Sequence, residues 1–543
     1  MGVNQIDSGL FAKAFIAGAK NLEANKEWIN ELNVFPVPDG DTGTNMTMTI
    51  MSAAKEVSEL GEKPEMAALC KAISSGSLRG ARGNSGVILS QLLRGFTKIV
   101  KTETEITIPI MASAFSKAVE TAYKAVMKPK EGTILTVARG MSDKANDLAA
   151  EGCDDLEKFC EQVLEHGKVV LEQTPELLPV LKEAGVVDSG GQGLIQFLSG
   201  CYDAYLGKEV DLTIGEESPE TKEEEKEELK YLYSVECKIS PERNFIPKNE
   251  IDLKNYLESI GESVVVINDG DVVRIHIHTN DPGLVLQKAI KYGSVKNVAV
   301  LNRAEESEKA TDNTENEPAF SEPPKPYGFI TVAAGDGLVE IFKSLGVDYV
   351  IEGGQTMNPS TADFIDAASK VNAETIFILP NNKNIILAAN QAAELVTDKT
   401  LLVIPSKTVP QGITAVVNFI PDLSADENEQ TMMEEIGKVK TGQVTYAVRD
   451  TSIDGKKIHK DDYMGLADSG LASVGTDKNK VIEELVESMV DESSELISIY
   501  YGQDITDDEA TAVSEMISSK FDKVDVELQA GGQPVYYYMI SVE

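Results

Sequence analysis

The chain has 543 residues, more than one hydrophobic core usually serves, so two to four domains are expected. Its 50 Lys and Arg residues are outnumbered by 89 Asp and Glu residues, which gives a net charge of −39. This charge argues against nucleic acid and anionic membrane surfaces as direct partners, and it suits divalent cations and basic partner proteins.

The cysteine content favours a reduced, cytoplasmic protein. The five cysteines are odd in number and show no Cys-x-x-Cys spacing. Four of them lie in helical patterns and are expected to be packing residues. The N-terminal stretch lacks the basic and apolar regions of a signal peptide, and no run of 18 apolar residues occurs, so no insertion into a membrane is expected.

The first block, residues 1–205, is predicted to be all-α. Apolar residues recur at spacings of three and four, as an amphipathic helix requires, and strand-like runs are scarce. The clearest helical patterns lie at 8–32, 45–60, 85–100 and 155–173.

A turn within this block, in the stretch NVFPVPDGDTGTNM at 33–46, is rich in short oxygen-bearing side chains. Asp39 and Asp41 lie two residues apart, so one turn can direct both carboxylates at one centre. Mg²⁺ is usually held by one or two carboxylates together with phosphate oxygens and water. Thr44 or Asn45 is expected to cap the next helix, whose N-terminus would attract phosphate. The stretch therefore indicates a magnesium–nucleotide site.

A simpler interpretation stays open, because an acidic, glycine-rich turn is most often only a turn. An EF-hand loop is excluded, since it needs an oxygen ligand where Gly43 lies and a Glu at the twelfth position, which is Ile50. An Asp-x-Asp-x-Thr phosphatase loop also fails, because it needs a hydroxyl at position 43 and a buried strand before it.

Two further glycine-bearing loops lie in the same block, at 77–91 and 184–194. In the first, SLRGARGNSGVILSQ, glycines and two arginines surround Asn84 and Ser85 just before an apolar helix. Glycine allows close backbone approach, Ser and Asn can bond phosphate oxygens, and arginine neutralises their charge. The second, AGVVDSGGQGL, places glycines and a carboxylate ahead of a helix. Neither is a Walker A loop, yet three such loops in one helical domain favour a nucleotide site.

These three motifs resemble those of the nucleotide-binding domain of dihydroxyacetone kinases, whose helices form an antiparallel barrel. With the length and three-part layout of this chain, the closer resemblance is to the ATP-binding subunit of bacterial two-component fatty acid kinases. This resemblance covers nearly the whole chain, and its first motif is highly specific.

The resemblance implies roles for individual residues. In dihydroxyacetone kinases three carboxylates hold two Mg²⁺ ions that bridge the ATP phosphates. Asp39 and Asp41 match two of them, and the third falls at or near Asn33, which is neutral here. The residues implied to contact the nucleotide or its phosphates are Thr42, Gly43, Thr44, Asn45, Asn84, Ser85, Thr133, Ile134, Asp188, Ser189 and Gly190.

An acidic linker at 206–228 leads to a second block, 229–303, in which β-branched runs alternate with helical segments. This pattern predicts a small α+β domain. His276 and His278 lie two apart in a predicted strand and therefore face the same side, where Cys237 from a neighbouring strand could join them.

Cys with two His is a plausible zinc set that lacks a fourth ligand. The alternative is a solvent-facing histidine pair beside an unrelated buried cysteine. The resemblance to fatty acid kinases favours zinc, because the middle domain of that family carries a Cys–His–His site at matching positions.

A second acidic, Pro-rich linker at 304–326 precedes the third block, 327–543, where short buried strands alternate with helices. This order predicts a parallel α/β sheet, with the stretch at 444–450 and the last strands added to it. Residues 353–364 and 404–415 resemble worn versions of loops that hold the lipid carboxylate in DegV-type fatty-acid-binding proteins. The resemblance implies that this DegV-like domain docks a separate acyl-carrying protein. Helix caps and turns explain the same Ser, Thr and Gly residues without any ligand.

The function expected is a phosphotransferase that moves the ATP γ-phosphoryl group to a fatty acid carboxylate, giving an acyl phosphate for phospholipid synthesis. That carboxylate, with a pKa of about 4 to 5, is ionised at neutral pH and needs no general base. Asp39 and Asp41 would hold Mg²⁺, and Arg82, in preference to Arg79, would steady the transferring group. The sequence shows no long apolar pocket, so the acid is expected on a separate DegV-type protein.

Two rival functions stay open. The chain could be a kinase for a small polyol such as dihydroxyacetone, or a non-catalytic adaptor that only senses ATP. The cofactors expected are ATP and Mg²⁺, with zinc in the middle domain. The sequence leaves a homodimer open.

Overall fold

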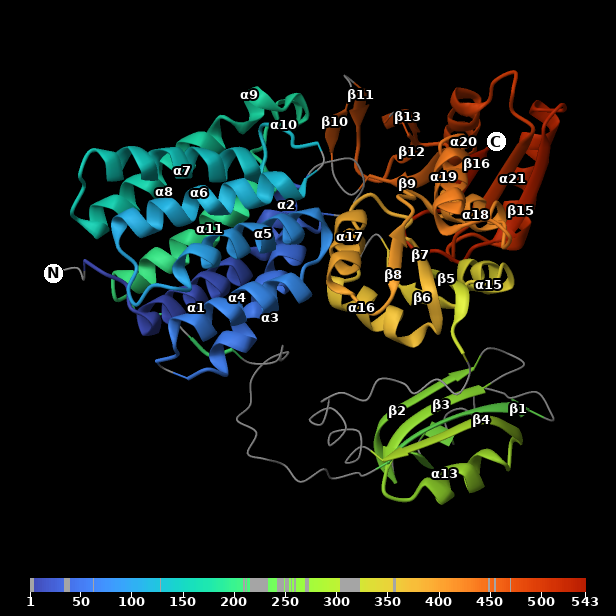
Figure 1. Ribbon diagram of the computed structural model, residues 1–543. Helices are drawn as coiled ribbons and strands as arrows, with labels where there is room; N and C mark the ends of the chain where they lie inside the picture. The colour runs from blue at the N-terminus through green and yellow to red at the C-terminus, as the bar shows by residue number, and fades with distance from the viewer. Residues whose placement is uncertain are drawn as a thin grey trace. The chain divides into compact units, whose positions relative to one another are not determined.

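The computed structural model of the protein forms two compact units, residues 1–214 with 320–543, and residues 215–319 (Figure 1). It describes residues 4–33, 40–61, 63–126, 128–208, 210, 212–214, 233–241, 249, 253–254, 256–257, 260–268, 273–302, 323–354, 358–447, 450–453, 456–468 and 470–543. In this part of the chain, no helix combines the length and apolar content that crossing a bilayer requires.

The N-terminal part of the first unit is helical, as the spacing predicts. Its helices are α1 (Ser8–Ala24), α2 (Lys26–Leu32), α3 (Thr42–Ser58), α4 (Met66–Arg79), α5 (Gly83–Val100), α6 (Ile108–Ala125), α7 (Ile134–Ala150), α8 (Leu156–Glu172), α9 (Thr174–Leu177), α10 (Pro179–Ala184) and α11 (Ser189–Tyr205). Asp7, Asp155 and Asp188 fix three of the helix starts, because each side chain accepts a hydrogen bond from a first-turn N–H group.

The helices enclose one continuous apolar core, in which Phe15, Met46 and Phe159 are almost fully buried. An apolar cavity of about 170 Å³ lies within this core, and Phe11, Phe96 and other aromatic and aliphatic side chains line it. The sequence analysis expected no long apolar pocket. It missed this one because the lining side chains come from helices far apart in the chain.

The C-terminal part of the first unit begins with a parallel sheet of order β6-β5-β7-β8. Its strands are β5 (Lys325–Ala333), β6 (Tyr349–Glu352), β7 (Ala373–Leu379) and β8 (Thr400–Val403). The helices that accompany it are α15 (Asp336–Ser344), α16 (Thr361–Lys370), α17 (Ile386–Leu395), α18 (Val409–Val417) and α19 (Ala425–Ile436). The strands are buried aliphatic runs, as parallel strands covered on both faces require.

The remaining strands form a second sheet, of order β13-β12-β9-β16-β14-β15. These strands are β9 (Lys440–Tyr446), β12 (Tyr463–Ala467), β13 (Gly470–Gly475), β14 (Leu496–Tyr501), β15 (Asp525–Ala530) and β16 (Tyr538–Val542), with a small hairpin of β10 (Thr451–Ile453) and β11 (Lys456–Ile458). The expectation that 444–450 and the last strands extend the parallel sheet was wrong. In the second sheet β14 and β15 pair in parallel, whereas the other neighbouring strands pair antiparallel.

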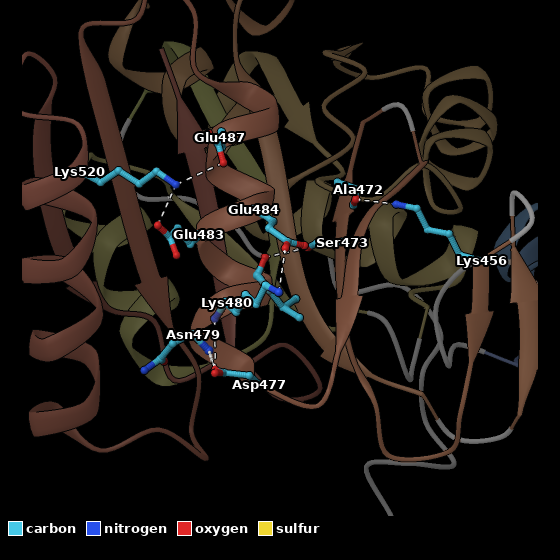
Figure 2. A network of polar contacts seen from close by, with 11 residues as sticks. Lys456, Ala472, Ser473, Asp477, Asn479, Lys480, Glu483, Glu484, Glu487 and Lys520 are labelled. Atoms are coloured by element: carbon cyan, nitrogen blue, oxygen red, sulfur yellow. Dashed lines mark hydrogen bonds and ion pairs between the residues drawn. The ribbon is translucent and has the colours of Figure 1, made fainter.

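Two helices pack on this second sheet, α20 (Lys478–Met489) and α21 (Asp507–Lys520). Figure 2 shows the polar contacts that fix them. Asp477 caps α20 by accepting from the N–H groups of Asn479 and Lys480, and Lys520 of α21 reaches Glu483 and Glu487 of α20 at 2.8 and 3.2 Å. These contacts cap α20 and join it to α21, in a region that carries none of the predicted site residues.

The helical and α/β parts of the first unit share buried contacts. Ala81 and Val87, which flank the start of α5, belong to the apolar cluster that covers the parallel sheet. Gln391 of α17 donates to the carbonyl oxygen of Leu78 at 2.8 Å and accepts from Gln91 at 3.2 Å. The two parts are therefore packed against each other at the second glycine-bearing loop.

The second unit contains an antiparallel sheet of order β2-β3-β1-β4 and the helix α13 (Pro282–Ala289). Its strands are β1 (Tyr233–Pro241), β2 (Gly261–Asn268), β3 (Val273–Thr279) and β4 (Gly293–Asn302). The helical, α+β and α/β classes predicted for the three blocks are confirmed.

Candidate functional site

The first predicted turn leads directly into α3, which begins at Thr42 with Asp41 as its N-cap. The expectation that Thr44 or Asn45 would be the cap was wrong by one turn, because Thr42 to Asn45 already have helical geometry. The Asp41 carboxylate makes no capping bond to its own helix. It therefore lies at the positive end of the helix dipole with oxygen lone pairs available for other partners.

The helix before this turn holds it through Asn30, a residue that the sequence analysis missed. The Asn30 side chain accepts from the Thr44 N–H at 3.1 Å and donates to the Thr44 hydroxyl at 3.0 Å. Gly43 allows this close packing, since a Cβ there would lie 2.1 Å from the carbonyl oxygen of Lys26. Nothing in the sequence spacing distinguishes Asn30 from its neighbours, because its role depends on how α2 folds back on α3.

The second glycine-bearing loop packs on the first turns of α3. The N–H of Arg82 donates to the Thr49 hydroxyl at 3.2 Å. Gly83 has a φ of 59°, and a Cβ on it would lie 2.6 Å from the Asn45 amide nitrogen. The loop therefore needs glycine for both its conformation and its contact with α3.

The third predicted loop leads into α11 and contacts the start of α7. Asp188 caps α11 by accepting from the Gly191 N–H at 2.7 Å, and it also accepts from the backbone of Ile134. Gly190 lies close to Ile134, since a Cβ on Gly190 would be 3.3 Å from the Ile134 Cβ. Thr133 is the N-cap of α7. The structure thus brings Thr133, Ile134 and the Asp188–Gly190 turn together.

The helices α3 and α11 also meet near their N-termini. A Cβ on Gly193, in the first turns of α11, would lie 2.6 Å from the sulfur of Met46 in α3. The glycine-bearing starts of α3, α5 and α11 therefore gather at one end of the helical bundle. Helix N-termini present N–H groups and positive dipole ends, so this arrangement suits a polyanion.

Two carboxylates at this end have perturbed acidity. Burial raises the pKa of Asp41, and hydrogen bonds from Asn45 and Asn358 partly oppose that rise. Burial also raises the pKa of Asp188 to about 6, and the bonds from Gly191 and Ile134 oppose it. A cation beside Asp41 would compensate the cost of keeping its charge buried.

The arginines of the second loop differ in their partners. Arg79 is exposed and pairs with Glu56 at 2.6 Å. Arg82 is half-buried, donates to the carbonyl oxygen of Asn358 at 2.7 Å and lies 3.4 Å from Asp363. Arg82 therefore lies beside the Asp41 turn, which agrees with its choice over Arg79.

The α/β part of the unit contributes Asn358 to this end of the bundle, a residue that the sequence analysis assigned no role there. Its side-chain nitrogen lies 2.5 Å from an Asp41 carboxylate oxygen and 3.5 Å from the Asn45 amide oxygen. The Thr361 N–H donates to the carbonyl oxygen of Ala81 at 3.1 Å. The sequence signal was only the polar turn at 353–364, interpreted as a worn lipid loop or as caps.

Some predicted site residues cannot be placed against the others. Asp39 lies outside the described residues. Asn33 ends α2 at the edge of that gap, where its N–H donates to the Asn30 carbonyl oxygen at 3.1 Å. Asn84 donates to the Asn384 side chain at 3.3 Å, so it also faces the α/β part. Ser85 and Ser189 lie in the first turns of α5 and α11. Their predicted ligand roles remain predictions.

The strand register of the second unit does not support the zinc set. On the antiparallel pair β1–β3, Cys237 lies opposite Ile275, whereas His278 lies opposite Ser234. Cys237 is buried with Ile275 and Ile277 in the apolar core, so His278, one residue further along, belongs to the other face. Burial raises the pKa of the Cys237 thiol to about 11.

The side chain of His276 lies outside the described residues. Within the described part of the chain, no three or more His, Cys, Asp and Glu side chains gather in a group that would hold a metal ion. Strand parity explains why the sequence could not settle this set, because the period of each strand can be read from its residues but the relative register of two strands cannot.

Comparisons with known proteins agree with this architecture. The family models that match are the DAK2 domain at 36–203, the FakA-like middle domain of fatty acid kinase at 230–310 and the FakA-like C-terminal domain of fatty acid kinase at 328–543. Protein YloV of Bacillus subtilis strain 168 is 43% identical over 559 residues, with both chains fully covered. An uncharacterised protein of Staphylococcus aureus strain USA300 is 40% identical over 550 residues, again with full coverage.

A multidomain chain with these three matched regions defines a kinase component of the fatty acid kinase type. The protein belongs to the FakA-like family of fatty acid kinases.

Solved structures are more distant. Dihydroxyacetone kinase from C. freundii, in complex with AMP-PNP and Mg²⁺, is 16% identical with a TM-score of 0.29, over 37% of this chain and 34% of that one. A fatty acid kinase B3 protein of Streptococcus pneumoniae, loaded with linoleic acid, is 12% identical with a TM-score of 0.28, over 40% of this chain and 99% of that one. Similarity this low says nothing about the ligands of the present chain.

Proposed function

We propose that the protein binds Mg·ATP at the gathered starts of α3, α5 and α11 and transfers the γ-phosphoryl group to a fatty acid carboxylate. The acid would be presented by a separate acyl-binding protein in the cytoplasm, and the product would be an acyl phosphate for phospholipid synthesis. The observation that carries this proposal is the convergence of three glycine-bearing helix starts at the end of the bundle that carries Asp41.

The residues at this end suit the group that the proposal requires. Asp41 supplies a carboxylate that makes no capping bond to the backbone of its own helix, and the N–H-rich starts of the helices suit phosphate oxygens. Asp39 would be the second carboxylate, with Asn33 as the proposed third position. When bound, Mg²⁺ supplies charge neutralisation on the phosphates.

The protein's own groups then have distinct tasks. Thr42 to Asn45 form the first turn of α3, where the backbone N–H groups of Thr42 and Gly43 and the threonine hydroxyl groups would align the phosphates. Arg82 carries a positive charge at the edge of the same turn and would stabilise the transferring group. The acceptor carboxylate is ionised at neutral pH, with a pKa of about 4 to 5, so no side chain has to remove a proton.

The acyl chain has two candidate locations, a separate carrier protein and the apolar cavity of this chain. The DegV-like part would dock a carrier that presents the acid, as the family resemblance implies. The apolar cavity of about 170 Å³ inside the helical bundle favours a second candidate, in which this chain binds the acid itself. A cavity of that volume holds only part of a long acyl chain, so we favour the carrier.

An ATP-consumption assay separates these functions. The full-length protein with Mg·ATP is given, in separate reactions, a DegV-type carrier loaded with fatty acid, the free acid without carrier, dihydroxyacetone, or no acceptor. We expect turnover and acyl phosphate only with the loaded carrier. Turnover with free acid alone would support binding in the cavity, turnover with dihydroxyacetone a polyol kinase, and none in any reaction an ATP-sensing adaptor.

A further inference from the structure

Asn358 belongs to the α/β part of the first unit but lies at the predicted magnesium turn of the helical part. It is 2% exposed, so water does not solvate its amide. Its side-chain nitrogen contacts Asp41, which is 317 positions away in the sequence. A fully buried amide placed against a buried carboxylate needs a physical account.

The chemistry of the two groups fixes which end of the amide faces Asp41. An ionised carboxylate only accepts hydrogen bonds, so the amide NH₂ group must point toward it. The side-chain nitrogen lies 2.5 Å from the carboxylate oxygen, which places the NH₂ group in hydrogen-bond contact with Asp41. The amide oxygen then has to point elsewhere.

That oxygen has no hydrogen-bond partner among the described residues, although it is buried. Leaving such a bond unmade destabilises the folded protein, and buried polar atoms without partners are rare in folded proteins. The atom therefore indicates that a donor or a cation occupies the space beside it in the working protein.

The groups expected nearby narrow the choice of partner for the amide oxygen. Phosphate oxygens only accept, so the triphosphate group would repel the amide oxygen. A divalent cation bound by Asp41, or a water molecule in its coordination shell, would satisfy the oxygen directly. Amide carbonyl oxygens are normal ligands for hard cations, and metal-bound water is a strong donor.

We propose that Asn358 is a positioning residue of the magnesium site, so that the α/β part of the chain completes the kinase site of the helical part. The NH₂ group holds one oxygen of Asp41 and leaves the other for the metal. The amide oxygen of Asn358 faces the metal or its water. This inference rests on the proposed function and names a residue of that same site.

The proposal also couples metal binding to the contact between the two parts. The backbone carbonyl oxygen of Asn358 accepts from Arg82, and Thr361, three residues later, bonds to Ala81. One short segment therefore holds both the metal ligand and the arginine. Because coupling is reciprocal, Mg·ATP should strengthen the contacts that this segment makes with Asp41, Arg82 and Ala81, and loosening those contacts should weaken Mg·ATP binding.

The test uses the full-length protein and measures ATP binding by calorimetry while the Mg²⁺ concentration is varied. Asn358→Ala should raise the Mg²⁺ concentration needed for half-maximal ATP binding about tenfold, the effect expected for a bond to a charged group. Gln391→Ala is the matched control. It removes a buried amide from the same contact between the parts, at Leu78 and Gln91, and should change that concentration less than twofold.

A second variant keeps the proposal open to refutation if Asn358→Ala folds poorly. Asn358→Asp puts two carboxylates side by side, so its thermal midpoint without Mg²⁺ should fall below that of the wild type, and added Mg²⁺ should raise it more than it raises the wild type. The proposal is overturned if Asn358→Ala binds Mg·ATP like the wild type, if Gln391→Ala loses as much, or if Mg²⁺ gives Asn358→Asp no additional rise.

Asp41→Ala distinguishes this failure from that of the proposed function. If Asp41→Ala loses Mg·ATP binding while Asn358→Ala keeps it, only the role of Asn358 is wrong. If Asp41→Ala also keeps it, the magnesium assignment itself fails.

Discussion

The start of α3 in the first unit and the β1–β3 pair in the second unit both carry side chains that suit a metal ion, but they assemble them differently. At α3 the polar residues are consecutive, and a helix start brings them to one point whatever the rest of the chain does. On β1–β3, Cys237 and His278 come from different strands, and the register sends them to opposite faces. Residues that are consecutive in one turn therefore stay together in any tertiary structure, whereas a set spread over two strands depends on the register of those strands.

Among the variants that test the site at α3, loss of the Asp41 carboxylate is expected to have the largest effect on activity. Asp41→Ala should lower ATP-dependent acyl phosphate formation about a hundredfold or more, because the charge of the triphosphate would no longer be balanced by a held metal ion. Product formation with a loaded carrier is the measurement. Asp155→Asn replaces the N-cap of α8 by another capping residue and does not touch the turn, so this control should retain full activity. Normal turnover of Asp41→Ala at physiological Mg²⁺ would contradict the assignment.

The next largest effect is expected from a substitution that disturbs the packing of α2 on the same turn. Gly43→Ala would put a methyl group 2.1 Å from the Lys26 carbonyl oxygen, so α2 must move and the protein should lose about 1 to 3 kcal/mol of stability. The chain's single tryptophan, Trp28, lies on α2 and reports this in urea unfolding followed by fluorescence.

The matched control for Gly43 lies in the other unit. A Cβ on Gly283, near the start of α13, meets no atom within 4 Å, so Gly283→Ala should change stability by no more than about 0.5 kcal/mol. Its stability is measured by far-ultraviolet circular dichroism, since Trp28 does not report on that unit. Equal stability of Gly43→Ala and wild type would show that α2 does not pack on the turn as described.

In the second unit, the zinc content of the protein tests whether the strand register separates Cys237 from His278. Purified protein should contain less than one zinc per chain by mass spectrometry of metals, because the register separates Cys237 from His278. Cys237→Ser should cost about 1 to 2 kcal/mol through a hydroxyl placed in the apolar core, with no change in metal content. One zinc per chain that this substitution removes would restore the zinc site.

Particular residues show how far sequence alone reaches. The glycine-bearing loops and the carboxylate of Asp41 could be identified because their chemistry lies in consecutive residues. Asn30 and Asn358 could not, since each acts only through a tertiary contact that no spacing encodes. The fold classes followed from hydrophobic periodicity. The second sheet was missed because strand order depends on long-range pairing.

The last prediction depends on pH and concerns Asp188, whose pKa burial raises to about 6 from an ordinary value of 3.8. Between these values the folded state binds the proton more tightly than the unfolded state, so this group's contribution to stability is greatest below pH 3.8 and declines as the pH rises through 6. Asp188→Asn keeps a capping side chain but cannot titrate. Relative to wild type, it should gain roughly 1 to 3 kcal/mol between about pH 4 and pH 7, as measured by urea unfolding at several pH values. A difference between the two proteins that stays constant with pH would mean that the Asp188 carboxylate is better solvated than its position among α7 and α11 implies.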